Sequence, residues 1–249
     1  MEYNYSDRSQ KLVFGSMRML EYSYSLEYWV DLFEDLYDFG VTTFHSSNEY
    51  DSFPFFCKVI TVFQKKNPDK KIQHIIKIAE PHFNINTFDA NLLEEKINEY
   101  CRNLNVSSIE NIQWMWRGNL QDNVQREQLF DQNYPEIEKA ILNLKKTNKI
   151  KKFYCFPYNL DFALSAIKKD QIDGLIVYRN VLEKEYDTAL KLGAKLNKKS
   201  YIIRPLNAGK VLSGVNQSSK SLVQWALNFP NIEGAIISIS SVSRLKEII

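Results

Sequence analysis

The sequence predicts an α/β fold, a single (β/α)8 TIM barrel that occupies residues 1–249 as one domain. Short apolar segments rich in β-branched residues alternate eight times with helical patterns, at a spacing of about 30 residues. Such alternation is typical of parallel strands covered by helices, and eight repeats favour a closed barrel over an open sheet. The length of 249 residues suits one barrel, and no stretch rich in Pro, Gly and Ser divides the chain.

The eight expected strands are short runs of strand-forming residues that end at glycine, proline or polar residues. In chain order they cover 12–14, 41–44, 73–78, 109–116, 150–156, 174–178, 201–203 and 234–239. Gly15 ends the first run, and a polar loop from His45 to Tyr50 follows the second. Because the loops after the strands of a barrel carry its chemistry, this polar loop is the first candidate for a functional site.

The helices between the strands are recognised by apolar residues three and four positions apart. In chain order they cover 25–39, 54–66, 90–104, 135–146, a short helix ending at 168, one ending near 196, 218–229 and a last helix that is cut short. The first carries an apolar stripe from Leu26 to Tyr37 and ends at Gly40. Pro135 is expected in the first turn of its helix, where a missing N–H is tolerated.

The composition is that of an ordinary soluble protein, with 44% hydrophobic and 25% charged residues. The net charge of +2 and the scattered Lys and Arg residues argue against binding to nucleic acid or to an anionic membrane. No apolar run approaches the ~20 residues of a membrane span, and the polar N-terminus over 1–10 is not a signal peptide. We therefore expect a cytoplasmic monomer or homodimer that acts on a small-molecule substrate.

The cysteines and histidines predict neither disulfides nor a metal site. Cys57, Cys101 and Cys155 are odd in number and have no paired spacing, which indicates a reducing compartment and no zinc site. The three histidines also lack the spacing of metal ligands. We expect no bound metal.

The chain resembles the aldo/keto reductases over nearly its whole length. The resemblance lies in the segments LVFGSMRM (12–19), FGVTTFHSSNEY (39–50), LNLKKTNKIKKF (142–153), RPLNAGKVLSG (204–214) and QWALNFP…SVSRLKE (224–247). Members of that family are (β/α)8 barrels that bind NADP(H) and pass a hydride between the nicotinamide and a carbonyl carbon. The resemblance implies a barrel of the aldo/keto reductase type with a shortened C-terminus, and NADP(H) as cofactor.

The resemblance also implies four catalytic residues. Tyr50 stands at the position of the family's proton-donating tyrosine, and Lys77 is the best match for the lysine that assists it. A tyrosine with an ordinary pKa near 10 is a poor acid at pH 7 unless a nearby cation lowers that pKa. His45 stands where the family has an aspartate, and Trp116 where it has a histidine. An indole donates one hydrogen bond but does not exchange a proton at neutral pH.

On the cofactor side, two segments resemble the family's phosphate-binding parts. The implied cofactor-binding residues are Arg204, Leu206, Ala208 and Gly209 for the pyrophosphate, and Ser240, Ser241 and Arg244 for the adenosine 2′-phosphate. Backbone amides and a guanidinium suit a phosphate. The alternative is that the two serines cap the last helix and that the arginine lies on its surface.

The residues that hold the nicotinamide in the family are replaced. Phe156–Pro157 stands for a Ser-Asn pair, Ile176 for a glutamine and Ile203 for an aromatic residue, and Ile248 stands for the asparagine that contacts adenine. Each buried polar group of the cofactor left without a partner would cost about 1–3 kcal/mol.

Two hypotheses about function follow. The first is NADP(H)-dependent reduction of an aldehyde, ketone or sugar-type carbonyl, with Tyr50 as acid, Lys77 as its activator and His45 as a replacement partner. The second is a diverged barrel without hydride transfer, which binds a carbohydrate-like ligand or performs cofactor-free acid–base chemistry. The second is favoured by the aromatic and polar groups expected at the strand ends, which are Tyr50, His82, Phe83, Trp116, Phe156, Tyr158 and Arg179.

Overall fold

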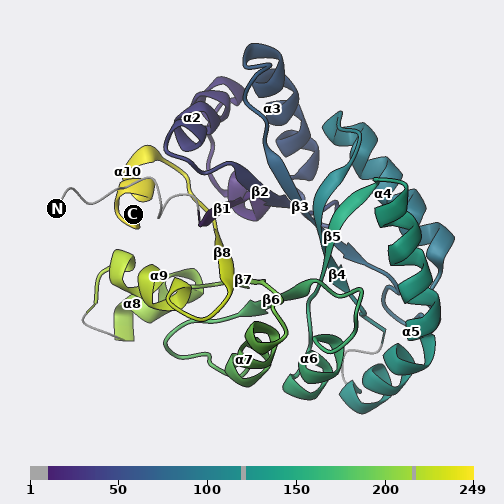
Figure 1. Cartoon of the computed structure of the whole chain (residues 1–249). Helices are drawn as coiled ribbons and strands as arrows, with labels where there is room; N and C mark the ends of the chain where they lie inside the picture. Colours follow the sequence, from purple (N-terminus) through teal and green to yellow (C-terminus); the bar gives the residue numbers. More distant parts are fainter. Residues whose placement is uncertain (1–10, 119–121, 215–216) are drawn as a thin grey trace. The chain divides into compact units, whose positions relative to one another are not determined.

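The computed structural model describes residues 11–118, 122–214 and 217–249. Its eight strands form a closed barrel in the order β1 to β8, with helices between successive strands (Figure 1). The strands are β1 (Leu12–Gly15), β2 (Thr43–Ser46), β3 (Gln73–Ala79), β4 (Ile109–Met115), β5 (Ile150–Cys155), β6 (Gly174–Tyr178), β7 (Ser200–Ile203) and β8 (Ile232–Ile237). The predicted (β/α)8 barrel is confirmed, and each predicted strand end lies within two residues of the observed one.

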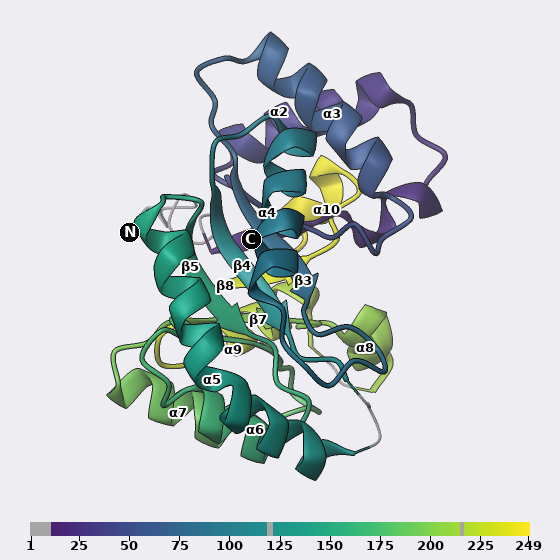
Figure 2. The ribbon, with the colours of Figure 1, turned by 90° about the vertical axis from the view of Figure 1, so that its right-hand side faces the viewer.

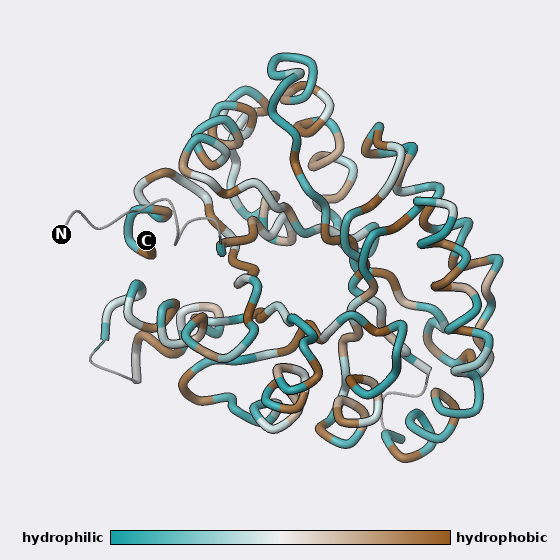
Figure 3. Tube along the Cα trace, viewed as in Figure 1, coloured by the Kyte–Doolittle hydropathy of each residue, from teal (hydrophilic) through white to brown (hydrophobic). Residues whose placement is uncertain are grey.

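The helices follow the strands in alternation. They are α2 (Leu26–Asp38), α3 (Phe53–Lys66), α4 (Ala90–Leu104), α5 (Asn123–Lys146), α6 (Leu160–Ala166), α7 (Asp187–Lys195), α8 (Lys210–Gly214), α9 (Ser219–Leu227) and α10 (Val242–Lys246), with 3-10 turns η1 (Ser16–Glu21) and η2 (Asn207–Gly209). Figure 3 shows apolar and polar residues alternating around the turns of the helices, as expected where one face of each helix is buried.

The chain divides into two compact units, which are described separately. The first comprises the described residues of Met1–His74, Tyr178–Lys184 and Ile202–Ile249, and the second comprises those of Ile75–Val177 and Glu185–Tyr201. That residues 1–249 act as a single domain stays a prediction.

In the first unit, aromatic packing determines which face of β1 and β2 meets the helices. The rings of Phe14 and Phe44 lie 5.0 and 4.7 Å from that of Phe33 in α2. Because side chains alternate along a strand, the neighbouring residues Gly15 and His45 project from the opposite face, away from the helices. Gly15 and His45 are also paired in register.

In the second unit, the contacts of Trp114 show which face of β4 meets the helices. Its ring lies 5.8 Å from that of Phe130 in α5 and 5.7 Å from that of Phe153 in β5. Figure 2 shows α4 and α5 lengthwise beside the strands of this unit. The residues on either side of Trp114, Gln113 and Met115, therefore project away from the helices.

Three sequence predictions need correction. β2 covers Thr43–Ser46 and not 41–44, because pairing with β1 continues to His45. β8 begins and ends two residues earlier than predicted, because its pairing with β1 ends at Ile237. Pro135 does not open a helix but lies inside the 24-residue helix α5, which begins at Asn123.

The long helix α5 tolerates its proline because its buried stripe continues on both sides of it. The stripe includes Phe130, Tyr134, Ile137 and Ile141. Proline in a helix interior costs about 3 kcal/mol, which the burial of two or more such side chains offsets.

Within the described ranges, no helix is both long and apolar enough to span a membrane. Residues 1–10, predicted not to be a signal peptide, lie outside those ranges.

Candidate active site

Tyr50 and His45 lie at the carboxyl end of β2, and the structure brings their rings together. The ring centroids are 6.0 Å apart, with the planes at 54°. His45 is buried in the strand and faces away from the helices, and Tyr50 is half-buried in the loop that follows. The predicted proton donor therefore has a buried imidazole as its neighbour.

Buried serine hydroxyls hold the loop that carries Tyr50. The Ser16 hydroxyl donates to Ser46 Oγ at 2.7 Å, and the Ser52 hydroxyl donates to the Ser16 carbonyl at 2.9 Å. The Tyr50 amide donates to the Ser47 carbonyl at 3.1 Å. These bonds join the loops after β1 and β2. Sequence reasoning missed this network because a run of serines is typical of an exposed loop.

Lys77 lies in β3, two residues before the strand ends, and belongs to the second unit. It is half-buried and pairs in register with Gln113, so both side chains project from the face away from the helices. The Tyr100 hydroxyl of α4 donates to the Lys77 carbonyl at 3.3 Å. The orientation suits the predicted role, and the pairing of Lys77 with Tyr50 stays a prediction.

Trp116 follows β4 but packs on the helix side. Its ring meets that of Trp114 edge to face, with centroids 6.2 Å apart, and its side chain is fully buried. Its Nε1 is a buried nitrogen without a hydrogen-bond partner among the described residues. Full burial against Trp114 is typical of a packing residue, and the catalytic role of Trp116 stays a prediction.

Sequence reasoning missed two polar residues on the strands that follow β3 in the barrel. Gln113 in β4 pairs in register with Lys77 in β3 on one side and with Tyr154 in β5 on the other. The side chains of Gln113 and Tyr154 are buried. A polar row therefore crosses β3, β4 and β5 on the face away from the helices. The signal was present in the sequence, as polar residues inside apolar strands, but their common face depends on the register.

The segment predicted to bind pyrophosphate is a tight loop after β7. Arg204, Asn207, Ala208 and Gly209 have φ angles of 57°, 43°, 53° and 87°. Ala208 is exposed, and a Cβ at Gly209 would face open space. The Gly209 amide donates to the Leu206 carbonyl at 2.8 Å. The loop thus carries small side chains where a phosphate could approach its backbone.

Arg204 adds a positive charge to this loop. Its side chain is exposed, and its guanidinium lies 4.3 Å from the ring centroid of Tyr178. The Asn180 side-chain amide donates to the Arg204 carbonyl at 3.1 Å, which links the loops after β6 and β7.

The segment predicted to bind the 2′-phosphate begins α10. Ser241 caps this helix by accepting from the Arg244 amide at 3.2 Å, so the capping alternative is confirmed for Ser241. The Arg244 guanidinium lies 2.8 Å from Glu247, in an exposed ion pair of the kind that contributes little. The Ser240 carbonyl accepts from the Tyr28 hydroxyl of α2 at 2.9 Å. Partial burial raises the pKa of Tyr28 above its ordinary value.

The predicted cofactor-binding residues suit the phosphates of NADP(H), whereas the residues at the predicted nicotinamide end do not suit its carboxamide. Two exposed guanidiniums, serine hydroxyls and a glycine with open space above it suit phosphates. By contrast, Phe156 and Ile176, which replace the residues that hold the carboxamide, are buried and apolar. They offer no side-chain hydrogen bond to an amide.

Arg179 does not stand at a ligand-binding surface as the second hypothesis expected. Its guanidinium lies 4.1 Å from the ring centroids of both Trp225 and Phe229, and it donates to the Ala226 carbonyl at 3.0 Å. The arginine is buried and joins the loop after β6 to the C-terminal end of α9.

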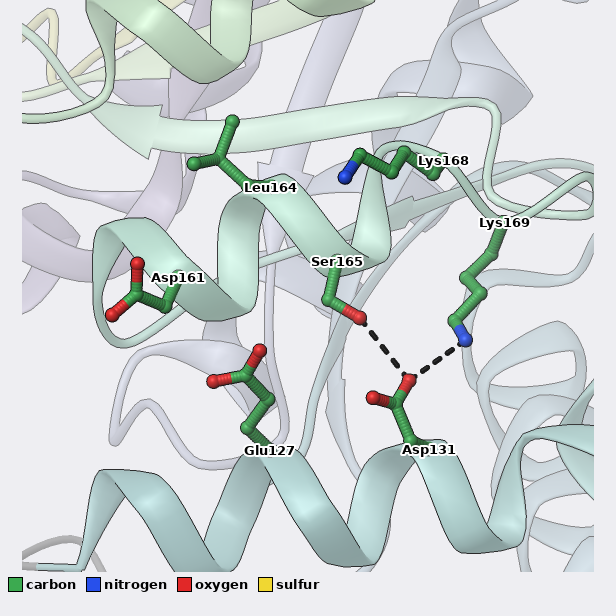
Figure 4. Close-up of a pocket in the computed structure, with 7 residues that line it drawn as sticks. All are labelled: Glu127, Asp131, Asp161, Leu164, Ser165, Lys168 and Lys169. Carbon is green, nitrogen blue, oxygen red and sulfur yellow. Dashed lines mark hydrogen bonds and ion pairs between the residues drawn. The ribbon is translucent and has the colours of Figure 1, made fainter.

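A surface pocket of about 460 Å³ lies between α5 and α6 (Figure 4). Asp131 at its edge accepts from the Ser165 hydroxyl at 3.1 Å and pairs with Lys169 at 2.7 Å. No predicted site residue lines this pocket. Within residues 11–118, 122–214 and 217–249, no group of three or more His, Cys, Asp or Glu side chains is placed to hold a metal ion.

Solved structures of aldo-keto reductases have the same fold. A protein from Pseudomonas aeruginosa assigned to the aldo-keto reductases has a TM-score of 0.75 at 15% identity, with 96% of this chain and 87% of that chain covered. An aldo-keto reductase from Bacillus halodurans, solved in its holo form, has a TM-score of 0.72 at 13% identity, with 95% and 84% covered. One from Klebsiella pneumoniae, in complex with NADP and acetate, has a TM-score of 0.69 at 15% identity, with 95% and 83% covered.

At these identities the likeness establishes the fold, which is the aldo/keto reductase type of barrel that the sequence predicts. Comparison with protein-family models gives no match, and comparison with curated protein sequences gives none either.

Proposed function

We propose that the protein is an NADP(H)-dependent oxidoreductase that reduces a carbonyl group, of an aldehyde, ketone or sugar-type substrate, with Tyr50 as proton donor. The observation that supports it most is the contact between Tyr50 and the buried His45 at the carboxyl end of β2, in a barrel with the aldo-keto reductase fold. The NADP bound to the Klebsiella pneumoniae structure adds support for the cofactor.

NADP(H), when bound, supplies the hydride. The residues of this chain would do the rest. Arg204 and Arg244 would hold the phosphates, with the backbone from Leu206 to Gly209 beside them. Tyr50 would donate a proton to the carbonyl oxygen, since a positioned phenol is a competent general acid. Lys77 would lower the pKa of that phenol by its positive charge, and His45 would orient it.

The first test is NADPH binding to the purified protein, measured by calorimetry and by nucleotide fluorescence. Micromolar binding is the expected result, and absence of binding at millimolar NADPH would refute the cofactor. A screen of aldehydes and sugar ketones would follow. Tyr50→Phe should then abolish reduction and leave NADPH binding intact, whereas Tyr37→Phe, in α2, should change neither. Unchanged turnover in Tyr50→Phe would remove Tyr50 from the mechanism.

A second candidate function is favoured by the apolar residues at the nicotinamide end. With Phe156 and Ile176 buried and Trp116 packed on the helix side, the barrel would bind a carbohydrate-like ligand or perform acid–base chemistry without hydride transfer. Under this alternative, Arg244→Ala would leave ligand binding unchanged. A large loss of affinity in that variant would favour the phosphate-bearing cofactor instead.

A further inference from the structure

Four aromatic residues of the first unit form a cluster at the start of α2, which we call the tyrosine platform. It consists of Tyr22, Tyr24, Tyr28 and Trp29. The rings of Tyr22 and Tyr24 are stacked, 5.5 Å apart and 11° from parallel, and the Tyr24 ring lies 4.2 Å from that of Tyr28. Trp29 is buried beneath them, with its ring 5.9 to 6.3 Å from each tyrosine ring.

The outer rings of the platform are accessible to a ligand. Tyr24 is 40% exposed and Tyr28 37% exposed, although both rings pack against other aromatic residues. A buried indole with stacked phenols above it forms a rigid support. The exposed parts of the Tyr24 and Tyr28 rings are therefore held in place before any ligand arrives, and little conformational freedom would be lost on binding.

The platform adjoins the segment proposed to bind the adenosine 2′-phosphate. The Tyr28 hydroxyl donates to the Ser240 carbonyl at 2.9 Å, and Ser241 and Arg244 follow within the next turn. A group bound at this segment would therefore have exposed aromatic rings next to it.

Adenine has the chemistry that such a surface recognises. In NADP(H) the base is one ribose away from the 2′-phosphate, so the base must lie close to whatever residues hold that phosphate. A nucleobase stacks on tyrosine irrespective of its hydrogen-bonding edge. The asparagine expected to contact adenine is Ile248 here, which is buried and has no polar side-chain atom. Stacking would replace that lost contact.

We infer that the adenine ring of NADP(H) stacks on the exposed rings of Tyr24 and Tyr28. This inference rests on the proposed function, because it requires that the 2′-phosphate binds at Ser240, Ser241 and Arg244. It assigns the affinity for the base to α2 and the segment before it, outside the segments from which the cofactor-binding residues were expected.

Calorimetric titration with adenosine 2′,5′-bisphosphate tests it without any need for turnover. Tyr24→Ala should weaken binding by at least about fivefold, the lower end of what removal of a stacked ring causes. Tyr28→Phe keeps the ring and removes only the bond to Ser240, so it should bind nearly as well as the native protein. Inorganic pyrophosphate, which has no base, should bind native protein and Tyr24→Ala alike.

The outcomes separate the two proposals. If the native protein binds neither the bisphosphate nor NADPH, the proposed cofactor fails, and the inference fails with it. If the native protein binds the bisphosphate and Tyr24→Ala binds it equally well, the inference alone is overturned. Circular dichroism and the melting temperature would show that Tyr24→Ala is folded. Saturation-transfer signals on the adenine H2 and H8 protons, lost in Tyr24→Ala, would locate the contact on the base.

Discussion

The Nζ atom of Lys96 lies 2.6 Å from Oε2 of Glu80, in an ion pair that joins α4 to the residue after β3. Glu80 is buried, and Lys96 also donates to the Ala79 carbonyl at 2.8 Å. The Glu80 carbonyl in turn accepts from Trp114 Nε1 at 2.6 Å. The pair thus stabilises the carboxyl end of β3, close to Lys77.

Lys96→Met should lower the free energy of unfolding by about 3–5 kcal/mol, because it leaves a buried carboxylate without its partner. Urea denaturation followed by circular dichroism measures this. Lys151→Met is the matched control, since Lys151 pairs with Glu110 at 3.5 Å on the surface and should lose no more than about 1 kcal/mol. The double variant Glu80→Gln/Lys96→Met should be more stable than Lys96→Met. Equal losses of unfolding free energy in Lys96→Met and Lys151→Met would contradict the conclusion that the Lys96–Glu80 ion pair stabilises β3.

His45→Ala should lower the rate of carbonyl reduction by about 10²-fold or more, if the imidazole takes part in proton transfer with Tyr50. Steady-state kinetics across pH 5–9 would check it, with NADPH affinity measured separately. Tyr37→Phe, in α2, is again the control and should change the rate little. If His45→Ala binds NADPH more weakly but reduces the carbonyl at the native rate when saturated with NADPH, the imidazole supports cofactor binding and not proton transfer.

The thiols should react slowly with thiolate-specific reagents. Burial raises the pKa of Cys57 to about 11, and burial also raises the pKa values of Cys101 and Cys155. At pH 8 only about one Cys57 in a thousand is then a thiolate. Because the thiolate fraction grows as the pH approaches the raised pKa, labelling of the native protein should accelerate about tenfold per unit from pH 8 to 10. A rate that levels off below pH 9 would show an ordinary thiol.

Gly174→Ala should be severely destabilising, by about 3 kcal/mol or more, since overpacking against backbone cannot relax through a rotamer change. A Cβ at this position would overlap the Lys199 carbonyl oxygen and lie 3.0 Å from Cε1 of Tyr154. Thermal unfolding provides the measurement. Gly193→Ala, in α7, is the control: its Cβ would lie 3.2 Å from Cγ1 and Cδ1 of the Ile167 side chain and 3.7 Å from the Lys198 carbonyl oxygen, and alanine favours a helix. A melting temperature close to native for Gly174→Ala would be inconsistent with the structure.

Most of the fold could be predicted from the sequence, because strand and helix patterns are local. The errors came where long-range contacts decide. His45 reads as a loop residue, but pairing with Gly15 extends β2 through it. Pro135 reads as a helix start, but the buried stripe of α5 continues past it. Periodicity shows where an element lies, and only pairing shows where it ends.

The candidate site was harder to predict for a related reason. The residue types and the order of Tyr50 and Lys77 are visible in the sequence, but the face from which a side chain projects is not. Trp116 looked equivalent to a catalytic histidine until its contact with Trp114 placed it on the helix side. The tyrosine platform was missed because three tyrosines before and within a helix resemble ordinary packing.

The alternation in β2 has a consequence for how this protein can vary. Phe44 and His45 are neighbours in a four-residue strand and project from opposite faces, one toward α2 and the other away from it. Deleting a single residue ahead of them would exchange their places, so that a phenyl ring would enter the site and an imidazole the packing layer. Insertions and deletions between Gly40 and His45 are thus not tolerable, and natural variants should keep the length of this segment unchanged.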